Sequence, residues 1–353
     1  NASSGLVTYP QSWSGATIIT ATALGCNGPK TSVHTATTNI PTSTISLVDG
    51  TQHQVLCSGA EFVPTVYKYG GSATGASVPY LPVGLTSTTN STNKTITISG
   101  TPYSTFSYTV QTNSSPCPAI IAGSAKLNNN ITAGEIGVNQ VICYGEKPGA
   151  ISSVASGNGS GTITYRWEKS SDGGNTWSVI SNEHNASYSP QSLTNNTQFR
   201  RTTISTVDNK SCYSEPTTPV IITVRPQPTL SFFINPEATC PERIASLTVV
   251  NGIDMNIDYT IKVDGSKNFD ASILANQNAT TTFSIQTPNV YTYSFSNFKY
   301  LDEPNCLNTS TISKSIKIYE LLSSGEISSA GETICNGATP GIISSVEPAK
   351  GGD

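Results

Sequence analysis

"TITYRWEKSSDGGNTWSVI", at residues 162–180, is the stretch that decides the fold. Its first part alternates apolar or β-branched side chains with polar ones, which is the period of a half-buried strand. The following "SSDGGNT" contains Gly173 and Gly174, and glycine adopts the positive φ values of a tight turn at no steric cost. "WSVI" then resumes the strand pattern. The stretch therefore predicts a β-hairpin.

The same hairpin matches S-x-D-x-G-x-T-W, the Asp-box pattern of sialidase propellers. The five matching positions are Ser170, Asp172, Gly174, Thr176 and Trp177. In sialidases the box is a structural turn that is repeated in each blade, away from the catalytic residues, whereas here it occurs once. We expect Asp172 to accept local backbone N–H groups and Thr176 to bond back across the turn. The match is therefore interpreted as a structural turn and not as part of a glycosidase site.

Further strand signals recur along the chain, each bounded by turn residues. They include 93–112, 198–207, 219–226, 290–300 and 310–319. No stretch shows a sustained helical period with caps. Short strands, dense turns and the lack of helices predict an all-β fold of Ig-like β-sandwiches. Trp167, on the third strand of such a sandwich, is expected in the core, and a sugar-stacking platform is the alternative.

The composition limits the architecture and the partners. Of 353 residues, 36 % are hydrophobic and 11 % charged, which suits several small β domains better than one large core. The net charge of −4 provides no basic stripe for nucleic acid. No long apolar run is present, so no membrane span is expected in this segment.

An internal repeat indicates the domain organisation. "GEIGVNQVICYGEKPGAISSV" starts at Gly134, and "GEISSAGETICNGATPGIISSV" starts at Gly325. The start of one domain type thus occurs twice, and both chain ends look like cuts through a longer protein. The expected parts are a C-terminal part of an Ig-like domain (1–45), three Ig-like domains (46–131, 132–226 and 227–320) and an N-terminal stub of a further repeat (321–353). Short proline-containing junctions, at 39–44 and 225–229, favour an extended rod.

Eight cysteines follow an alternation of short and long gaps, which suggests one pair per domain in an oxidising compartment. No zinc-ligand spacing links them. A Cys212–Cys240 bond would have to bridge "TTPVIITVRP", roughly 30 Å if extended, whereas bonded Cα atoms lie within about 7 Å. We therefore expect bonds within domains, and buried free thiols are the alternative. The expected pairs are Cys57–Cys117, Cys143–Cys212 and Cys240–Cys306, with Cys26 and Cys335 paired outside this segment.

Three stretches carry a family resemblance. "LPVGLTSTTNSTNKTITISGTPYSTFSYTVQT" (81–112) resembles the Ig-like domain of bacterial surface proteins, with its LPxGL, ISGTP and YTV elements. Residues 140–203 are similar to repeats in very large adhesins of the Bacteroidota, with the pattern ICxGxxP, YxWxxSxDGGxTW and FRR. "WSGATIITATALGCNGP" (13–29) resembles the end of such a repeat. The chain thus resembles the SprB-type gliding-motility adhesins.

This resemblance implies a filament on the cell surface of a Gram-negative bacterium. It implies export by type IX secretion, movement by the gliding machinery and attachment to the substratum or to surface polysaccharide. Neighbouring repeats of the same chain would be the structural partners. The segment lacks the C-terminal sorting region of the family.

One acidic stretch could bind a cation. "DMNID" (254–258) imitates the start of an EF-hand loop, and Asp254, Asn256 and Asp258 would share one strand face. However, Tyr259 and Gly265 occupy positions that an EF-hand reserves for Gly and Glu, which excludes that motif. We expect a solvated polar face, and a weak Ca²⁺ site at a domain junction is the alternative. No other cofactor is expected.

Catalytic signals are sparse. His34, His53 and His184 lie in no metal-binding or nucleophile motif, and there is no G-x-S-x-G, HExxH or Walker pattern. We expect no enzyme and no catalytic residue, and instead a structural and adhesive segment. One alternative is a carbohydrate-binding array that uses Tyr67, Tyr69, Tyr80 and Tyr103. The other is a non-catalytic stretch of a large secreted hydrolase.

Overall fold

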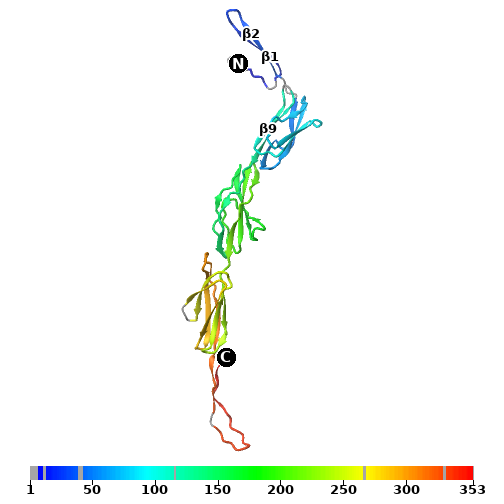
Figure 1. Cartoon of the computed structure of the whole chain (residues 1–353). Helices are drawn as coiled ribbons and strands as arrows, with labels where there is room; N and C mark the ends of the chain where they lie inside the picture. The colour runs from blue at the N-terminus through cyan, green and yellow to red at the C-terminus, as the bar shows by residue number, and fades with distance from the viewer. Residues whose placement is uncertain are drawn as a thin grey trace.

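The computed structural model describes residues 7–10, 13–38, 43–114, 117–264, 268–328 and 331–352. Within these residues the chain forms β-strands and no helix. The strands make three successive Ig-like β-sandwiches, with paired strands beyond each end of the series, and together they form the extended rod of Figure 1. The expected all-β architecture of tandem sandwiches is therefore confirmed.

The first sandwich comprises residues 43–128. One sheet has the order β3–β5–β8–β7, formed by Ser43–Asp49, Phe62–Gly71, Thr95–Gly100 and Leu85–Asn90. The facing sheet has the order β4–β10–β9–β6, formed by His53–Cys57, Ile120–Asn128, Phe106–Thr112 and Ala76–Ser77. Apolar side chains that alternate along these strands fill the space between the sheets, and Phe62, Tyr67 and Ile98 are almost completely buried there.

The second sandwich comprises residues 135–225. Its main sheet has the order β12–β18–β16–β14–β15, with β17 paired to β16. These strands are Gln140–Cys143, Val220–Arg225, Thr197–Val207, Thr162–Ser170, Ser178–Val179 and Lys210–Tyr213. The small facing sheet pairs β11 (Glu135–Ile136) with β13 (Ser153–Ala155). Trp167 is completely buried and packs with Phe199 and Ile222, since all three point inward from neighbouring strands.

The third sandwich comprises residues 231–318. One sheet has the order β19–β21–β24, formed by Ser231–Asn235, Ile244–Val250 and Asn278–Ser284. The other has the order β20–β27–β25–β22–β23, with β26 on β25. Its strands are Ala238–Thr239, Ile312–Ile318, Asn289–Tyr300, Ile257–Val263, Phe269–Ile273 and Leu307–Asn308. The rings of Phe232 and Phe295 stack between the two sheets, with centroids 3.6 Å apart.

Paired strands extend beyond the three sandwiches at both ends. β1 (Gly15–Ala23) and β2 (Lys30–Thr38) form an antiparallel hairpin. At the other end, β28 (Glu320–Ser323) pairs with β31 (Lys350–Gly352), and β29 (Glu326–Ile327) pairs with β30 (Ser345–Glu347). Most side chains of these pairs are exposed.

One expected domain boundary needs correction. The start expected at residue 46 lies inside β3, which begins at Ser43 and pairs with β5. The strand starts before its first apolar residue because Ser43 is buried and its hydroxyl donates a hydrogen bond to the Cys117 carbonyl. The proline-containing junction expected at 39–44 includes residues 39–42, which lie outside the described residues.

Candidate functional site

The junction between the first and second sandwiches is closed by a disulfide bond between Cys57 and Cys212, whose Cα atoms lie 5.6 Å apart. Cys57 ends β4, and the parallel register of β4 and β10 places it beside Asn128, the last residue of the sandwich. Cys212 lies on β17, which forms a short hairpin with the end of β16. Two connections therefore join these sandwiches, the peptide chain after Asn128 and the disulfide.

Polar contacts reinforce this junction. Asn128 is completely buried, and its Nδ2 donates to the Ser205 carbonyl at 2.7 Å. In return, the Ser205 hydroxyl donates to Asn128 Oδ1 at 2.7 Å. An exposed ion pair joins Lys126 and Asp208 at 2.6 Å. The reciprocal buried pair fixes orientation more strongly than the ion pair does, because solvent screens exposed charges.

The junction between the second and third sandwiches repeats this arrangement. Cys143, at the end of β12, is bonded to Cys306, with Cα atoms 5.4 Å apart. The buried Asn308 donates through Nδ2 to the Pro228 carbonyl at 3.0 Å. Arg225 Nη1 donates to the Asp302 carbonyl at 3.1 Å. Each junction thus combines a disulfide with a buried asparagine.

The expected disulfides Cys57–Cys117, Cys143–Cys212 and Cys240–Cys306 are wrong. Cys57 lies at one end of β10, whereas Cys117 precedes the other end, about 27 Å away along the strand. That separation far exceeds the reach of a disulfide. In each sandwich the earlier cysteine lies at the end that faces the following domain, and the later one lies at the opposite end. The spacing of the cysteines along the sequence indicates how many each domain contains. It does not show at which end of the sandwich each cysteine lies.

Three other cysteines have exposed thiols. Cys26, Cys240 and Cys335 make no disulfide with the residues that the structure describes. Pairing of Cys26 and Cys335 outside this segment stays a prediction.

The Asp-box stretch forms a closely hydrogen-bonded turn after β14. Asp172 accepts the Thr176 backbone N–H at 3.0 Å and the Thr176 hydroxyl at 2.5 Å, and the Ser170 hydroxyl donates to it at 2.7 Å. These bonds, chiefly those from Thr176, hold the pKa of Asp172 well below its usual range. Gly173 and Gly174 have φ values of 76° and 94°, so this turn requires glycine.

Trp177 packs beside the hairpin through its neighbours on the turn and on β16. Its Nε1 donates to the Gly174 carbonyl at 3.0 Å. The Arg200 guanidinium lies 4.1 Å from the centre of the Trp177 ring. Every functional group of the box is thereby engaged within its own hairpin or with the adjacent strand, which is the geometry of a structural turn.

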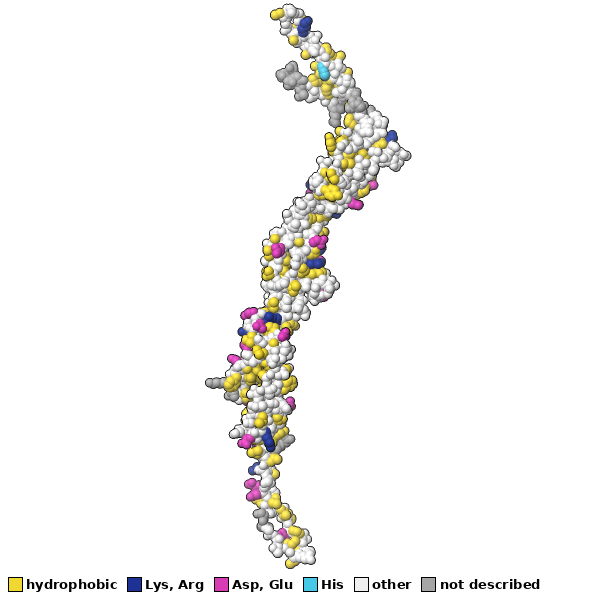
Figure 2. All heavy atoms as spheres, in the orientation of Figure 1, with side chains coloured by type: hydrophobic (Ala, Val, Ile, Leu, Met, Phe, Trp, Pro, Cys, Tyr) yellow, Lys and Arg dark blue, Asp and Glu magenta, His cyan; other side chains and the backbone are white. Residues whose placement is uncertain are grey.

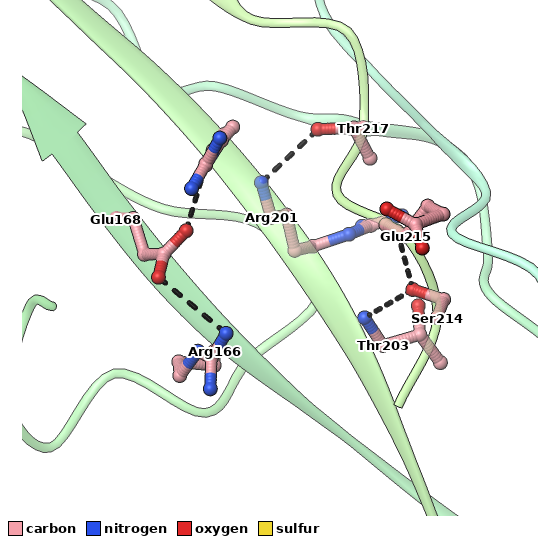
Figure 3. A network of polar contacts seen from close by, with 8 residues as sticks. Arg166, Glu168, Arg201, Thr203, Ser214, Glu215 and Thr217 are labelled. Carbon is pink, nitrogen blue, oxygen red and sulfur yellow. Dashed lines mark hydrogen bonds and ion pairs between the residues drawn. The ribbon is translucent and has the colours of Figure 1, made fainter. Parts of the chain in front are cut away.

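Arg201 anchors the second sandwich, and the sequence analysis assigned it no role although it is the last residue of the FRR element of the repeat pattern. Its guanidinium is completely buried and donates four hydrogen bonds, to the Ser153 hydroxyl and to the carbonyls of Ala133, Ala155 and Ala186. Burial lowers the pKa of this guanidinium. Figure 3 shows Arg201 together with the ion pair between Arg166 and the buried Glu168 on the neighbouring strand. The available signal was the alternation along β16, which places Arg201 on the same inward face as Phe199.

The candidate cation ligands are not brought together. β22 begins at Ile257, so Asp254 and Asn256 precede the strand and do not share a strand face with Asp258. Each has its own partner instead, Asn276, Ala275 and Ser272 respectively. Across the described residues, no group of three His, Cys, Asp or Glu side chains could hold a metal ion. Gly265, the last position of the imitated loop, lies outside those residues.

The tyrosines considered for polysaccharide binding divide into two pairs. Tyr67 and Tyr69 are 0 % and 4 % exposed, so they belong to the core and cannot contact a ligand. Tyr80 and Tyr103 are exposed. The four-residue aromatic surface of the carbohydrate-binding alternative is therefore not formed, because inward alternation along β5 buries half of it.

The three histidines lie apart from one another. His34 pairs with Ile19 in the end hairpin. His53 contacts the Ser124 hydroxyl in the first sandwich, and His184 faces the Tyr165 carbonyl in the second. They form no shared site. No helix in the described part of the chain is long and apolar enough to cross a membrane.

Comparison with known proteins shows similarity over parts of this architecture. Residues 132–226 match a family described as a domain of unknown function, DUF8696. No curated protein matches the chain in sequence. The family match covers less than half of the chain, so it leaves the family of the whole chain open.

Several solved structures are similar in shape. A mutated three-Ig fragment of titin, I67–I69, has 9 % identity and a TM-score of 0.45, covering 79 % of this chain and 98 % of the fragment. A Ca²⁺-stabilised adhesin with which an Antarctic bacterium binds ice has 13 % identity and a TM-score of 0.37, covering 81 % and 76 %. The ectodomain of mouse nectin-like molecule 4 has 11 % identity and a TM-score of 0.38, covering 76 % and 98 %. All three TM-scores are below 0.5, so these similarities support no functional assignment.

Proposed function

We propose that this segment is a non-catalytic, structural and adhesive part of a large filament on the surface of a Gram-negative bacterium. The observation that carries the proposal is the end-to-end series of three sandwiches with a disulfide across each junction. Disulfides persist in oxidising, extracellular compartments. A rod whose junctions are held by disulfides can keep an adhesive part of the filament at a fixed distance from the cell surface.

The surface of the rod fits this role. Figure 2 shows mostly uncharged polar side chains along the visible face, with small, scattered groups of charge. Charges of both signs are interspersed on this face, so it produces no strong single-sign field that would drive neighbouring copies apart. The resemblance of residues 140–203 to repeats in very large adhesins of the Bacteroidota supplies the proposed export by type IX secretion and the link to gliding.

Antibody fragments against the second sandwich test the location of the filament. We expect them to label intact cells of the bacterium that encodes the chain, and to leave cells with the gene deleted unlabelled. Labelling that requires permeabilised cells would contradict a surface filament.

Beads coated with the same fragments test the role in gliding. We expect bound beads to be carried along the cell in directed runs. Beads that bind but only diffuse would contradict the gliding role and would leave the proposal of a surface filament unaffected.

Cell attachment tests the adhesive role. Loss of cell attachment to glass on gene deletion would support the adhesive role, and unchanged attachment would contradict it.

A further inference from the structure

The two disulfides overlap along the sequence. Cys143 lies between Cys57 and Cys212, and Cys212 lies between Cys143 and Cys306. The covalent loops that they close therefore overlap along the chain, and neither contains the other. Each bond joins an early strand of one sandwich to a late segment of the next, so both junctions have a second covalent connection.

We infer that the overlapping disulfides form a strap that limits how far the rod extends under tension. The shortest covalent path from Ser43 to Ile318 runs forward to Cys57 and crosses to Cys212. It then runs backward to Cys143, crosses to Cys306 and continues forward. The limit follows from connectivity alone, so it goes beyond the proposed function and holds whatever the segment binds.

The length of this strap path can be counted. Its three pieces hold about 14, 69 and 12 residues, about 95 in all, whereas the peptide chain from Ser43 to Ile318 holds about 275 residues. At about 3.5 Å per residue, the maximum extensions are roughly 330 Å and 960 Å. The disulfides thus reduce the maximum extension to about one third.

The strap path also limits how much length each sandwich can contribute under tension. In the first sandwich it uses only the residues from Ser43 to Cys57, and in the third only those from Cys306 to Ile318. These short pieces give little extra length even if the sandwich around them unfolds. The second sandwich is different because about 69 residues of it, from Cys143 to Cys212, lie on the path. Two further segments, from Cys57 to Cys143 and from Cys212 to Cys306, connect the same two disulfides in parallel, so the first and third sandwiches must also open before the distance between the bonds can grow far. Under tension we therefore expect one long extension, limited by the roughly 69 residues of the second sandwich.

Removing one disulfide confines the long extension to a single sandwich. In Cys57→Ser/Cys212→Ser the path runs through the whole first sandwich to Cys143 and holds about 112 residues. In Cys143→Ser/Cys306→Ser it leaves Cys212 and runs through the whole third sandwich, and it holds about 120 residues. Each double variant therefore has its own contour length and its own unfolding sandwich.

Single-molecule pulling through ligated peptide tags at the two chain ends tests the strap. We expect one long step in the oxidised wild type, a single step of different length in each double variant, and three long steps after reduction. Cys240→Ser is the matched control, since its exposed thiol is in neither bond, and it should match the wild type. Equal contour lengths with and without reductant would overturn the inference, as would three long steps in the oxidised chain. If a double variant does not fold, the comparison of the oxidised with the reduced wild type still tests the inference.

Discussion

A single buried cation holds the second sandwich together at the scale of one residue. Arg201 has no carboxylate partner, and its two terminal nitrogens donate to three backbone carbonyls and one hydroxyl from separate segments of the chain. The Tyr165 ring, 4.4 Å away, covers its guanidinium. A buried charge without such partners would be very unfavourable, so the four acceptors and Arg201 require each other.

Replacing this side chain should destabilise the second sandwich. Arg201→Met removes the charge and leaves four acceptors without their donor, so we expect the free energy of unfolding to fall by roughly 3 kcal/mol or more. Urea unfolding followed by tryptophan fluorescence measures the change. Lys147→Gln, at an exposed position of the same sandwich, is the control and should change stability by less than about 0.5 kcal/mol. A similar small effect for both variants would contradict the anchoring role.

Titration of Asp172 tests the hydrogen bonds of the Asp-box turn. The folded-state pKa is depressed, so the stabilisation from the carboxylate is present above its ordinary pKa and is lost as the pH falls through the folded value. Thr176→Val removes the hydroxyl that lowers the pKa most, and the pKa of Asp172 should rise towards its ordinary value. Carboxyl ¹³C NMR titration of both proteins measures this, and an unchanged pKa would show that the hydroxyl is not a donor.

At the scale of the element, the long strands were predictable and the short ones were not. The interval 162–170 was expected as a strand and is β14, because its alternation is long enough to detect. β4, β12 and β20 have at most five residues, and each pairs in parallel with a strand distant in sequence. No periodicity is detectable over so few residues. Since these strands carry Cys57 and Cys143 to the junctions, missing them led to the wrong disulfides.

At the scale of the whole molecule, the sequence was sufficient to predict a rod of all-β sandwiches. It was not sufficient to predict the contacts that hold neighbouring sandwiches together. Patterns within one domain reveal strands and turns, whereas a junction is made by residues from two domains. Asn128 and Ser205, for example, lie far apart in sequence and form a buried reciprocal pair. Neither residue has a distinguishing neighbour pattern, so their pairing was not predictable.

The junction between the first and second sandwiches should keep its orientation until both the Cys57–Cys212 disulfide and the Asn128–Ser205 hydrogen bonds are removed. In Cys57→Ser/Cys212→Ser the Asn128–Ser205 pair still fixes the orientation, and small-angle scattering should show a maximum dimension close to that of the wild type. Adding Asn128→Ala removes both hydrogen bonds between Asn128 and Ser205, and we expect a broader distribution of distances with a shorter mean. Asn93→Ala, in an exposed turn far from the junction, is the control for the added change. A rod that bends as soon as the disulfide is removed would contradict a role for Asn128.

The overlapping bonds also make the rod resistant to being severed. A single cut of any peptide bond between Cys57 and Cys306 leaves both fragments joined, because at least one disulfide spans every position in that interval. This includes the exposed turn that ends at Lys94, where trypsin would readily reach the chain. Limited tryptic digestion should therefore give fragments that run as one species on a non-reducing gel and separate only after reduction. A filament in the proposed extracellular location cannot be resynthesised in place, and this connectivity lets it survive the first cut.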